Sequence, residues 1–259
     1  MMTKGVFFFA MVALLCRAGS VFGEISPGDI SPCIGAGVLV GGLFTRYTLE
    51  AQGELVIPID VRSNQELDQL NYGGFLFVDA TWVELSLSFQ GGKDTWRERY
   101  SATAKDGLVL TDTFSTGTGQ EAALGLVLLG KYPFRLGKAL SVFPLAGLEY
   151  RIALLECRDP EIGRPYDRTD GIRESDSNDQ AYALSAWNSL FIDIGAGLDL
   201  DLRSGLFLRT ELLYAFRLQT PFEKDALNKV KKKANAPDPK LGGLTSGPTL
   251  RIALGYRFY

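Results

Sequence analysis

Hydrophobic and polar residues alternate at every second position along several segments of the chain. The last such segment is TLRIALGYRFY, which ends at Tyr259. Its apolar face consists of Leu250, Ile252, Leu254, Tyr256 and Phe258. Arg251 and Arg257 lie on the opposite face. A period of two predicts a β-strand whose two faces meet different surroundings.

Five earlier segments show the same alternation and predict further strands: residues 81–89, 121–134, 140–154, 188–202 and 206–218. In 188–202 the even positions from Leu190 onward are apolar, whereas Asp193, Asp199 and Asp201 occupy odd positions. In 81–89, Trp82 shares the polar face with Glu84.

A soluble secreted β-sandwich and an outer-membrane barrel both show such alternation. The segments have nearly the 9 to 11 residues of a tilted membrane-spanning strand. In a membrane barrel the apolar face meets lipid and the polar face lines the lumen. We therefore predict one all-β domain, an eight-stranded antiparallel transmembrane β-barrel, with the sandwich as the alternative.

The predicted connections alternate between short and long. Residues 135–138 and 203–205 are short links, whereas 90–118, 156–187 and 219–246 are long. Short periplasmic turns and longer extracellular loops are typical of outer-membrane barrels.

An even strand number requires two strands near the N-terminal end of the barrel. We place them at residues 34–50 and 54–61, joined near Gln52 and Gly53. Asp79 shares the parity of the lipid-facing residues, so it marks either a bulge or the periplasmic end of a strand.

Residues 1–23 have the pattern of a secretory signal peptide. Lys4 precedes an apolar stretch, and small residues lead to Gly23, so cleavage would leave residues 24–259 as the barrel domain. Cys16 also follows the apolar stretch and leaves a lipoprotein signal as an alternative. The stretch is too short for a membrane-spanning helix.

The apolar, aromatic ending resembles the C-terminal assembly signal of bacterial outer-membrane barrels. The overall plan resembles small barrels of the outer-membrane protein X and W type. FLFVDATWVELSLSF, LLGKYPF, VFPLAGLEY and LYAFRL are similar to stretches of spirochaetal members. The resemblance implies outer-membrane lipid and the barrel-assembly machinery as partners, extracellular loops, periplasmic termini and a monomer.

Composition argues against several function classes. The chain contains no histidine, the usual general base and the commonest transition-metal ligand, so we expect no enzyme, metal site or cofactor. A formal net charge of −3 argues against nucleic acid as a partner. The stretch 159–179 is acidic enough to suggest calcium but is more typical of solvated surface.

Charged residues on the polar faces should converge inside the barrel. The candidates are Glu84, Glu149, Arg151, Asp193, Asp199, Asp201, Arg209, Glu211, Arg217, Arg251 and Arg257. Eight strands leave an interior that side chains just fill, so we expect these groups to pair and plug the lumen. A conducting pore is the alternative, and the resemblance to the protein W type implies a narrow path or a lateral exit for small apolar solutes.

The remaining candidate sites lie in loops. Lys229, Lys231, Lys232 and Lys233 could contact anionic lipid or a host polyanion such as a sulfated glycan. We therefore predict passage of a small solute or envelope architecture, with a surface adhesin as the alternative. Cys33 and Cys157 should lie at opposite ends of the barrel, too far apart for a disulfide.

Overall fold

The computed structural model describes residues 32–54, 58–104, 106–137, 139–162, 188–218 and 240–258. The predicted signal peptide and Cys16 lie outside these ranges. In the part of the chain described, no helix is long and apolar enough to cross a membrane.

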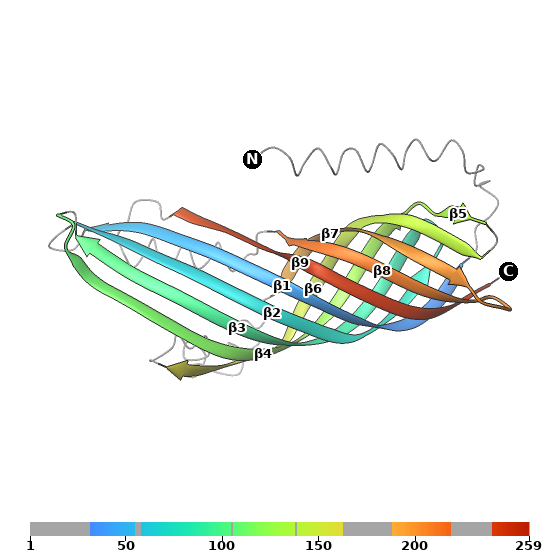
Figure 1. Cartoon of the computed structure of the whole chain (residues 1–259), viewed down its shortest axis with the longest axis horizontal. Coiled ribbons are helices and arrows are strands. Elements are labelled where there is room, and N and C mark those ends of the chain that lie inside the picture. The colour runs from blue at the N-terminus through green and yellow to red at the C-terminus, as the bar shows by residue number, and fades with distance from the viewer. Residues whose placement is uncertain are drawn as a thin grey trace.

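The described residues form antiparallel strands in a closed ring (Figure 1). The strands are β1 (Cys33–Glu54), β2 (Pro58–Asp79), β3 (Val83–Ala104), β4 (Val109–Lys131), β5 (Phe134–Leu136), β6 (Leu140–Ile162), β7 (Ser189–Asp201), β8 (Leu206–Arg217) and β9 (Lys240–Arg257). The ring order is β1-β2-β3-β4-β6-β7-β8-β9, and β9 pairs with β1. The short β5 pairs with β6. The predicted eight-stranded antiparallel barrel is therefore confirmed.

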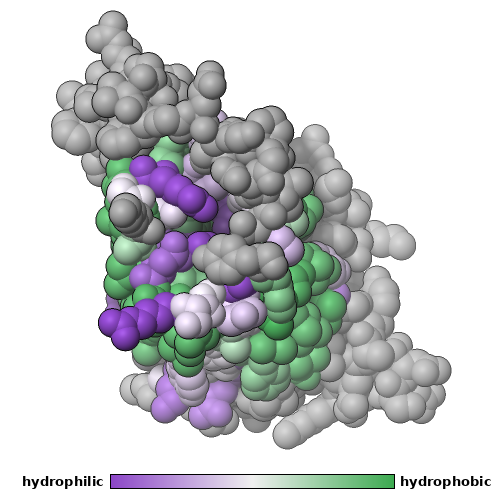
Figure 2. Space-filling model, turned by 90° about the vertical axis from the view of Figure 1, so that its right-hand side faces the viewer, coloured by the Kyte–Doolittle hydropathy of each residue, from purple (hydrophilic) through white to green (hydrophobic). Residues whose placement is uncertain are grey.

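The alternating faces of each strand point where the pattern predicts. On β8, Phe207 is 0% exposed and lies inside the barrel, whereas Leu212 is 57% exposed and lies outside. The outward apolar positions form a belt around the ring, and within this belt the charged side chains point into the lumen. Figure 2 shows hydrophobic residues along the flanks and hydrophilic residues gathered across the end of the barrel.

Strands β1 to β4 continue well beyond this apolar belt. Their outward side chains change from apolar to charged at Arg46, Asp68 and Lys93. We call the part beyond this change the extended sheet; it comprises residues 46–54, 58–68, 93–104 and 109–120. In Figure 1 it reaches far past the ends of β7 and β8.

Two predicted features of the N-terminal half are wrong. The second strand is not residues 54–61 but the whole of β2, and Glu54, at the end of β1, pairs with Pro58. The predicted long loop 90–118 is mostly strand, because β3 and β4 form a hairpin up to Ala104 and Val109. Polar residues on both faces of these segments hide the alternation, since both faces of a sheet outside the membrane can meet water.

A tight turn at residues 80–82 explains two further corrections. Asp79 ends β2, as one alternative proposed, but its side chain points inward and is buried. Trp82 lies in the turn and is exposed instead of facing the lumen. Thr81 adopts a positive φ of 71°, which is rare for a β-branched residue. After this turn the inward positions change from odd on β2 to even on β3.

Other strand ends differ from the prediction by smaller amounts. The fourth strand ends at Lys131, and β5 occupies part of the expected short link. The second predicted loop, 156–187, is strand as far as Ile162, so Cys157 lies within β6. Strand β9 begins at Lys240, inside the third predicted loop. The short link between β7 and β8 is confirmed. There Gly205 has a φ of +84°, and an added Cβ would lie 2.8 Å from the Arg257 carbonyl oxygen.

Candidate functional site

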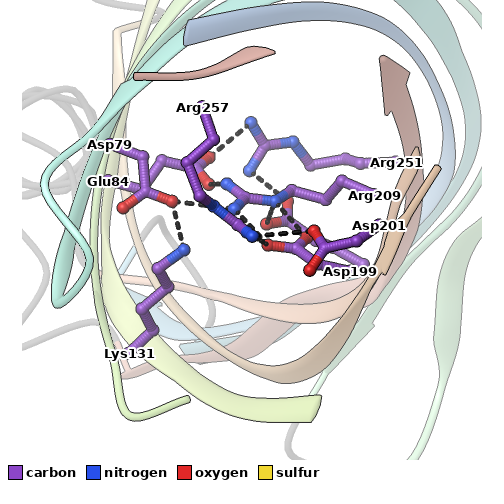
Figure 3. Close-up of polar contacts among 9 residues, drawn as sticks. Asp79, Glu84, Lys131, Asp199, Asp201, Arg209, Arg251 and Arg257 are labelled. Atoms are coloured by element: carbon purple, nitrogen blue, oxygen red, sulfur yellow. Dashed lines mark hydrogen bonds and ion pairs between the residues drawn. The ribbon is translucent and has the colours of Figure 1, made fainter. Parts of the chain in front are cut away.

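The lumen near the short turns contains a dense group of ion pairs centred on Arg209 (Figure 3). Arg209 extends from β8 and is 1% exposed. Its guanidinium donates two hydrogen bonds to Asp199, of 2.7 and 2.8 Å. Further contacts join it to Glu84 at 2.7 Å and Asp79 at 2.8 Å. One side chain thus links strands from opposite sides of the ring.

Other cations complete this group. Arg251 Nη2 lies 3.0 Å from Glu84, and Nη1 lies 2.8 Å from Glu211. Lys131 Nζ contacts Asp79. We call the whole set the Arg209 cluster: Asp79, Glu84, Lys131, Asp199, Asp201, Arg209, Glu211, Arg251 and Arg257.

Aromatic rings surround the cations of the Arg209 cluster. The Arg209 guanidinium lies 4.6 Å from the Phe77 ring centre and 5.1 Å from that of Phe207. The Arg251 guanidinium lies 4.0 Å from the ring centre of Phe75. Ring faces attract cations and exclude water, so the cluster fills the barrel interior with paired charge and aromatic side chains.

A second ionic layer lies deeper along the barrel axis, toward the long strands. Arg151 donates two hydrogen bonds of 2.8 Å to the Glu149 carboxylate, and Gln90 donates another of 3.0 Å. The Arg151 guanidinium also stacks 4.5 Å from the Phe191 ring centre. We call Gln90, Glu149 and Arg151 the Glu149 layer.

Two cavities lie on either side of the Glu149 layer. The larger, about 120 Å³, opens toward the long strands and includes Arg151, Phe191 and Arg217 in its lining. The smaller, about 20 Å³, lies between the layer and the Arg209 cluster and has Asp193 and Arg251 in its wall. A void of the smaller size holds about one water molecule.

The structure places all eleven predicted lumen residues on inward positions and divides them among four regions. Seven belong to the Arg209 cluster: Glu84, Asp199, Asp201, Arg209, Glu211, Arg251 and Arg257. Glu149 and Arg151 form the second layer, Asp193 lies between the two layers, and Arg217 lines the larger cavity.

Sequence reasoning missed two members of the Arg209 cluster. Asp79 was assigned the lipid-facing parity because the turn at 80–82 was not recognised. Lys131 has inward parity at the end of its strand, and this signal was sufficient to include it. Both side chains are buried and contact each other.

The proposed assembly-signal residues of β9 all point outward. Tyr256 and Phe258 pack edge to face with ring centres 5.3 Å apart. Lys229, Lys231, Lys232 and Lys233 lie outside the described residues.

Potential metal ligands do not gather in the part of the chain that the structure describes. The described residues contain no group of three or more Cys, Asp or Glu side chains arranged to hold a metal ion. Cys33 is buried and free, and the side chain of Cys157 lies outside the description. Most of the acidic stretch 159–179 also lies outside it.

The closed ring, apolar outer belt and charged interior define the architecture of a small outer-membrane β-barrel. No family model and no curated protein matches the chain. Among solved structures, it is similar to the outer membrane protein OprG from Pseudomonas aeruginosa, with 12% identity, a TM-score of 0.35 and coverage of 87% of this chain and 96% of that one.

Two further solved structures resemble this chain to a similar degree. The N-terminal β-barrel domain of Pseudomonas aeruginosa OprF is 14% identical with a TM-score of 0.28, covering 86% of this chain and 97% of that one. Ail, the attachment invasion locus protein of Yersinia pestis, is 14% identical with a TM-score of 0.27, covering 88% and 99%. At these values the likenesses imply nothing about what this chain binds.

Proposed function

We propose that this chain is an integral outer-membrane barrel with a closed lumen, which serves envelope architecture and holds the extended sheet outside the membrane. The observation that carries the proposal is the Arg209 cluster, which joins opposite sides of the ring and fills the lumen. An axial solute path would have to break several buried ion pairs, each of which is costly to separate.

The proposed orientation follows from the outer surface. The apolar belt meets lipid, the turns at 80–82 and 202–205 lie in the periplasm, and the extended sheet lies outside the cell. Outer-membrane lipid and the barrel-assembly machinery are the proposed partners of a monomer. Resemblance to the X and W type and to spirochaetal barrels is part of this proposal, and the signal peptide at 1–23 provides export.

Passage of a small solute along the axis is the less favoured role. The Glu149 layer and the Arg209 cluster lie in series, and a void of about 20 Å³ separates them. A conducting state would require both layers to open. Of the two predicted roles, solute passage and envelope architecture, the closed lumen therefore supports envelope architecture.

Conductance in a planar lipid bilayer tests the proposal. The wild type should give no steady ion current. Removing the charge-balanced pair Glu149→Ala and Arg151→Ala should also leave the barrel closed, because the Arg209 cluster remains. Current should appear when Glu84→Ala and Arg209→Ala are added. Steady current through the wild type would contradict the closed lumen.

A surface adhesin is the second candidate, and the extended sheet favours it. From Phe89 at the edge of the apolar belt, β3 continues to Ala104, about 50 Å of chain at the usual rise of a strand. The outer face of the extended sheet contains ion pairs between neighbouring strands, including Arg46–Asp68 at 2.8 Å and Arg99–Asp112 at 2.7 Å. Hydrogen bonds from Arg99 hold the pKa of the Asp112 carboxyl below its usual value.

Binding of intact cells to immobilised heparin tests the adhesin. Cells that display the wild type should bind, and added salt should weaken binding because it screens charges. Replacing Lys229, Lys231, Lys232 and Lys233 by alanine should abolish binding, whereas Arg203→Ala, in the exposed turn between β7 and β8 on the proposed periplasmic side, should not. Equal binding by cells that lack the protein would exclude this role.

A further inference from the structure

The larger lumen cavity is a built pocket rather than a gap between strands. Its lining includes a residue from every strand of the ring: Thr45, Gln69, Trp96, Ala123, Arg151, Phe191, Arg217 and Thr245. Its volume of about 120 Å³ approaches the roughly 150 Å³ of a protein cavity that holds benzene. A ligand of about that size would fit.

Two arginines border one aromatic ring at the base of this pocket. Arg217 of β8 lies directly opposite Phe191 of β7 in the sheet register. From β6, which pairs with β7 on its other edge, the Arg151 guanidinium lies 4.5 Å from the centre of the Phe191 ring. The sheet thus brings two guanidinium groups to one apolar surface.

Both arginines retain N–H groups without an acceptor. Arg217 Nε is buried and has no hydrogen-bond partner among the described residues. Arg151 uses two nitrogens for Glu149, and its Nη1 has no partner in the same part of the chain. Trp96 Nε1 is a third such donor, on a side chain that is 7% exposed. Buried donors without acceptors are costly, and a ligand with acceptor oxygens would satisfy them.

The acidic residues of the lining already have partners. Glu98 accepts a 2.7 Å hydrogen bond from Ser63, and Glu66 lies near Arg46 and Arg97. Asp94 and Glu121 also make interactions within the protein. Glu149 compensates Arg151, and Arg217 Nε remains a buried donor that no acceptor in the described ranges satisfies.

We propose that this cavity binds a small organic carboxylate. The carboxylate group contacts Arg217 and the free nitrogen of Arg151, because planar guanidinium groups match carboxylates in shape and charge. The apolar part of the ligand lies against Phe191, Trp96 and Leu43, which also line the cavity. The inference adds a ligand to the barrel and does not depend on whether the lumen conducts.

Calorimetric titration of the full chain refolded in detergent micelles tests the site. Benzoate is the probe, with benzyl alcohol and benzylamine as ligands of matched size and different charge. Benzoate should bind at least about tenfold more tightly than benzyl alcohol, because a hydrogen bond to a charged group discriminates by that factor or more. Benzylamine should not bind. Absence of saturable benzoate binding, or tighter binding of benzylamine, would overturn the proposal.

Substitutions locate the site within the barrel. Arg217→Gln should weaken benzoate binding about tenfold or more, since it removes the charge, and Arg217→Lys should retain part of the affinity. The matched control Arg203→Gln alters an exposed arginine in the turn between β7 and β8 and should change nothing. Unchanged benzoate affinity in Arg217→Gln would overturn the assignment.

A second variant covers the case in which Arg217→Gln does not fold, as judged by heat-modifiable migration on a detergent gel. Trp96→Phe removes the indole N–H and retains an aromatic ring, so the pocket keeps most of its packing. It should weaken benzoate more than benzyl alcohol. Equal effects on both ligands would contradict the role of the indole donor.

Discussion

Arg209 is a charged residue that is almost completely removed from solvent. Its guanidinium contacts Asp79, Glu84 and Asp199, and three phenylalanine rings surround it. The planar group has donors enough for several carboxylates at once, which a lysine ammonium would satisfy less well. The barrel interior therefore depends on this one cation to balance several buried anions.

Replacing Arg209 by methionine should destabilise the barrel by about 3 to 5 kcal/mol, because the carboxylates remain buried without their partner. Methionine packs against the same rings, so the loss reports charge rather than volume. The free energy of unfolding in detergent, from urea titration, measures the effect.

Arg203→Met is the matched control for this change. Arg203 is exposed in a turn, and its replacement should alter the free energy of unfolding by less than about 0.5 kcal/mol. Equal losses in both variants would show that Arg209 has no special role.

Residue parity predicts most of the interior from sequence. Glu84, Arg209, Glu211 and Arg251 are correctly placed inside because each lies on a strand with a regular alternation. Parity fails at Asp79, where a three-residue turn resets the register, and it does not specify which inward charges meet. Pairing depends on the positions of strands around the ring, which alternation alone does not determine.

At the scale of elements, the strands differ in length and in the polarity of their outward face. β7 and β8 have 13 and 12 residues, close to the length that crosses a bilayer. β1, β2 and β3 have 22 residues each. Strands of membrane length are predicted well because one face must be apolar. The β3 and β4 parts of the extended sheet fall in the predicted loop 90–118, because polar residues on both of their faces hide the alternation.

Leu212→Arg should impair insertion, since an arginine facing lipid near the bilayer midplane costs about 2 to 4 kcal/mol. Leu206→Arg, on the same face at the end of β8, should cost about 1 kcal/mol or less because it lies near the interface. Folding yield and unfolding free energy in lipid vesicles measure both effects. Similar costs at the two depths would contradict a membrane-facing β8.

The aromatic end of β9 allows a separate test of assembly. Tyr256→Asp with Phe258→Asp should prevent insertion in cells, and the protein should be recovered as periplasmic aggregate after fractionation. Tyr132→Asp is the control, because Tyr132 is an exposed aromatic at the same end of the barrel but outside the last strand. If this control fails as completely as the double variant, the effect belongs to the aromatic girdle and not to an assembly signal.

Gly255 is unsuitable as a control in that experiment. It lies on the inward face, and an added Cβ would come within 2.2 Å of the Phe207 ring. Gly255→Ala should therefore disturb packing inside the barrel, for a reason unrelated to targeting.

At the scale of the whole molecule, the strands extend much further beyond the apolar belt at one end of the barrel than at the other. The short turns end near the apolar belt, whereas the β3–β4 hairpin ends far from it at Gly107, where a side chain would have no neighbour within 4 Å. This asymmetry gives the proposed orientation a direct test.

A peptide tag inserted at Gly107 should be accessible to antibody on intact cells. The same tag at Ser204 should require a permeabilised outer membrane, because that turn faces the periplasm in the proposed orientation. Labelling at Ser204 but not at Gly107 on intact cells would reverse the topology.

Pairing between β9 and β1 also has a consequence for folding kinetics. Cys33 pairs with Arg257 in the strand register. The hydroxyl groups of Thr45 and Thr245, which are 200 residues apart in the sequence, share a hydrogen bond. A contact order this high predicts slow folding, because the ring cannot close before the last strand is present. Until then both edge strands are open to intermolecular pairing, so the cell has to protect the nascent chain from aggregation until β9 arrives.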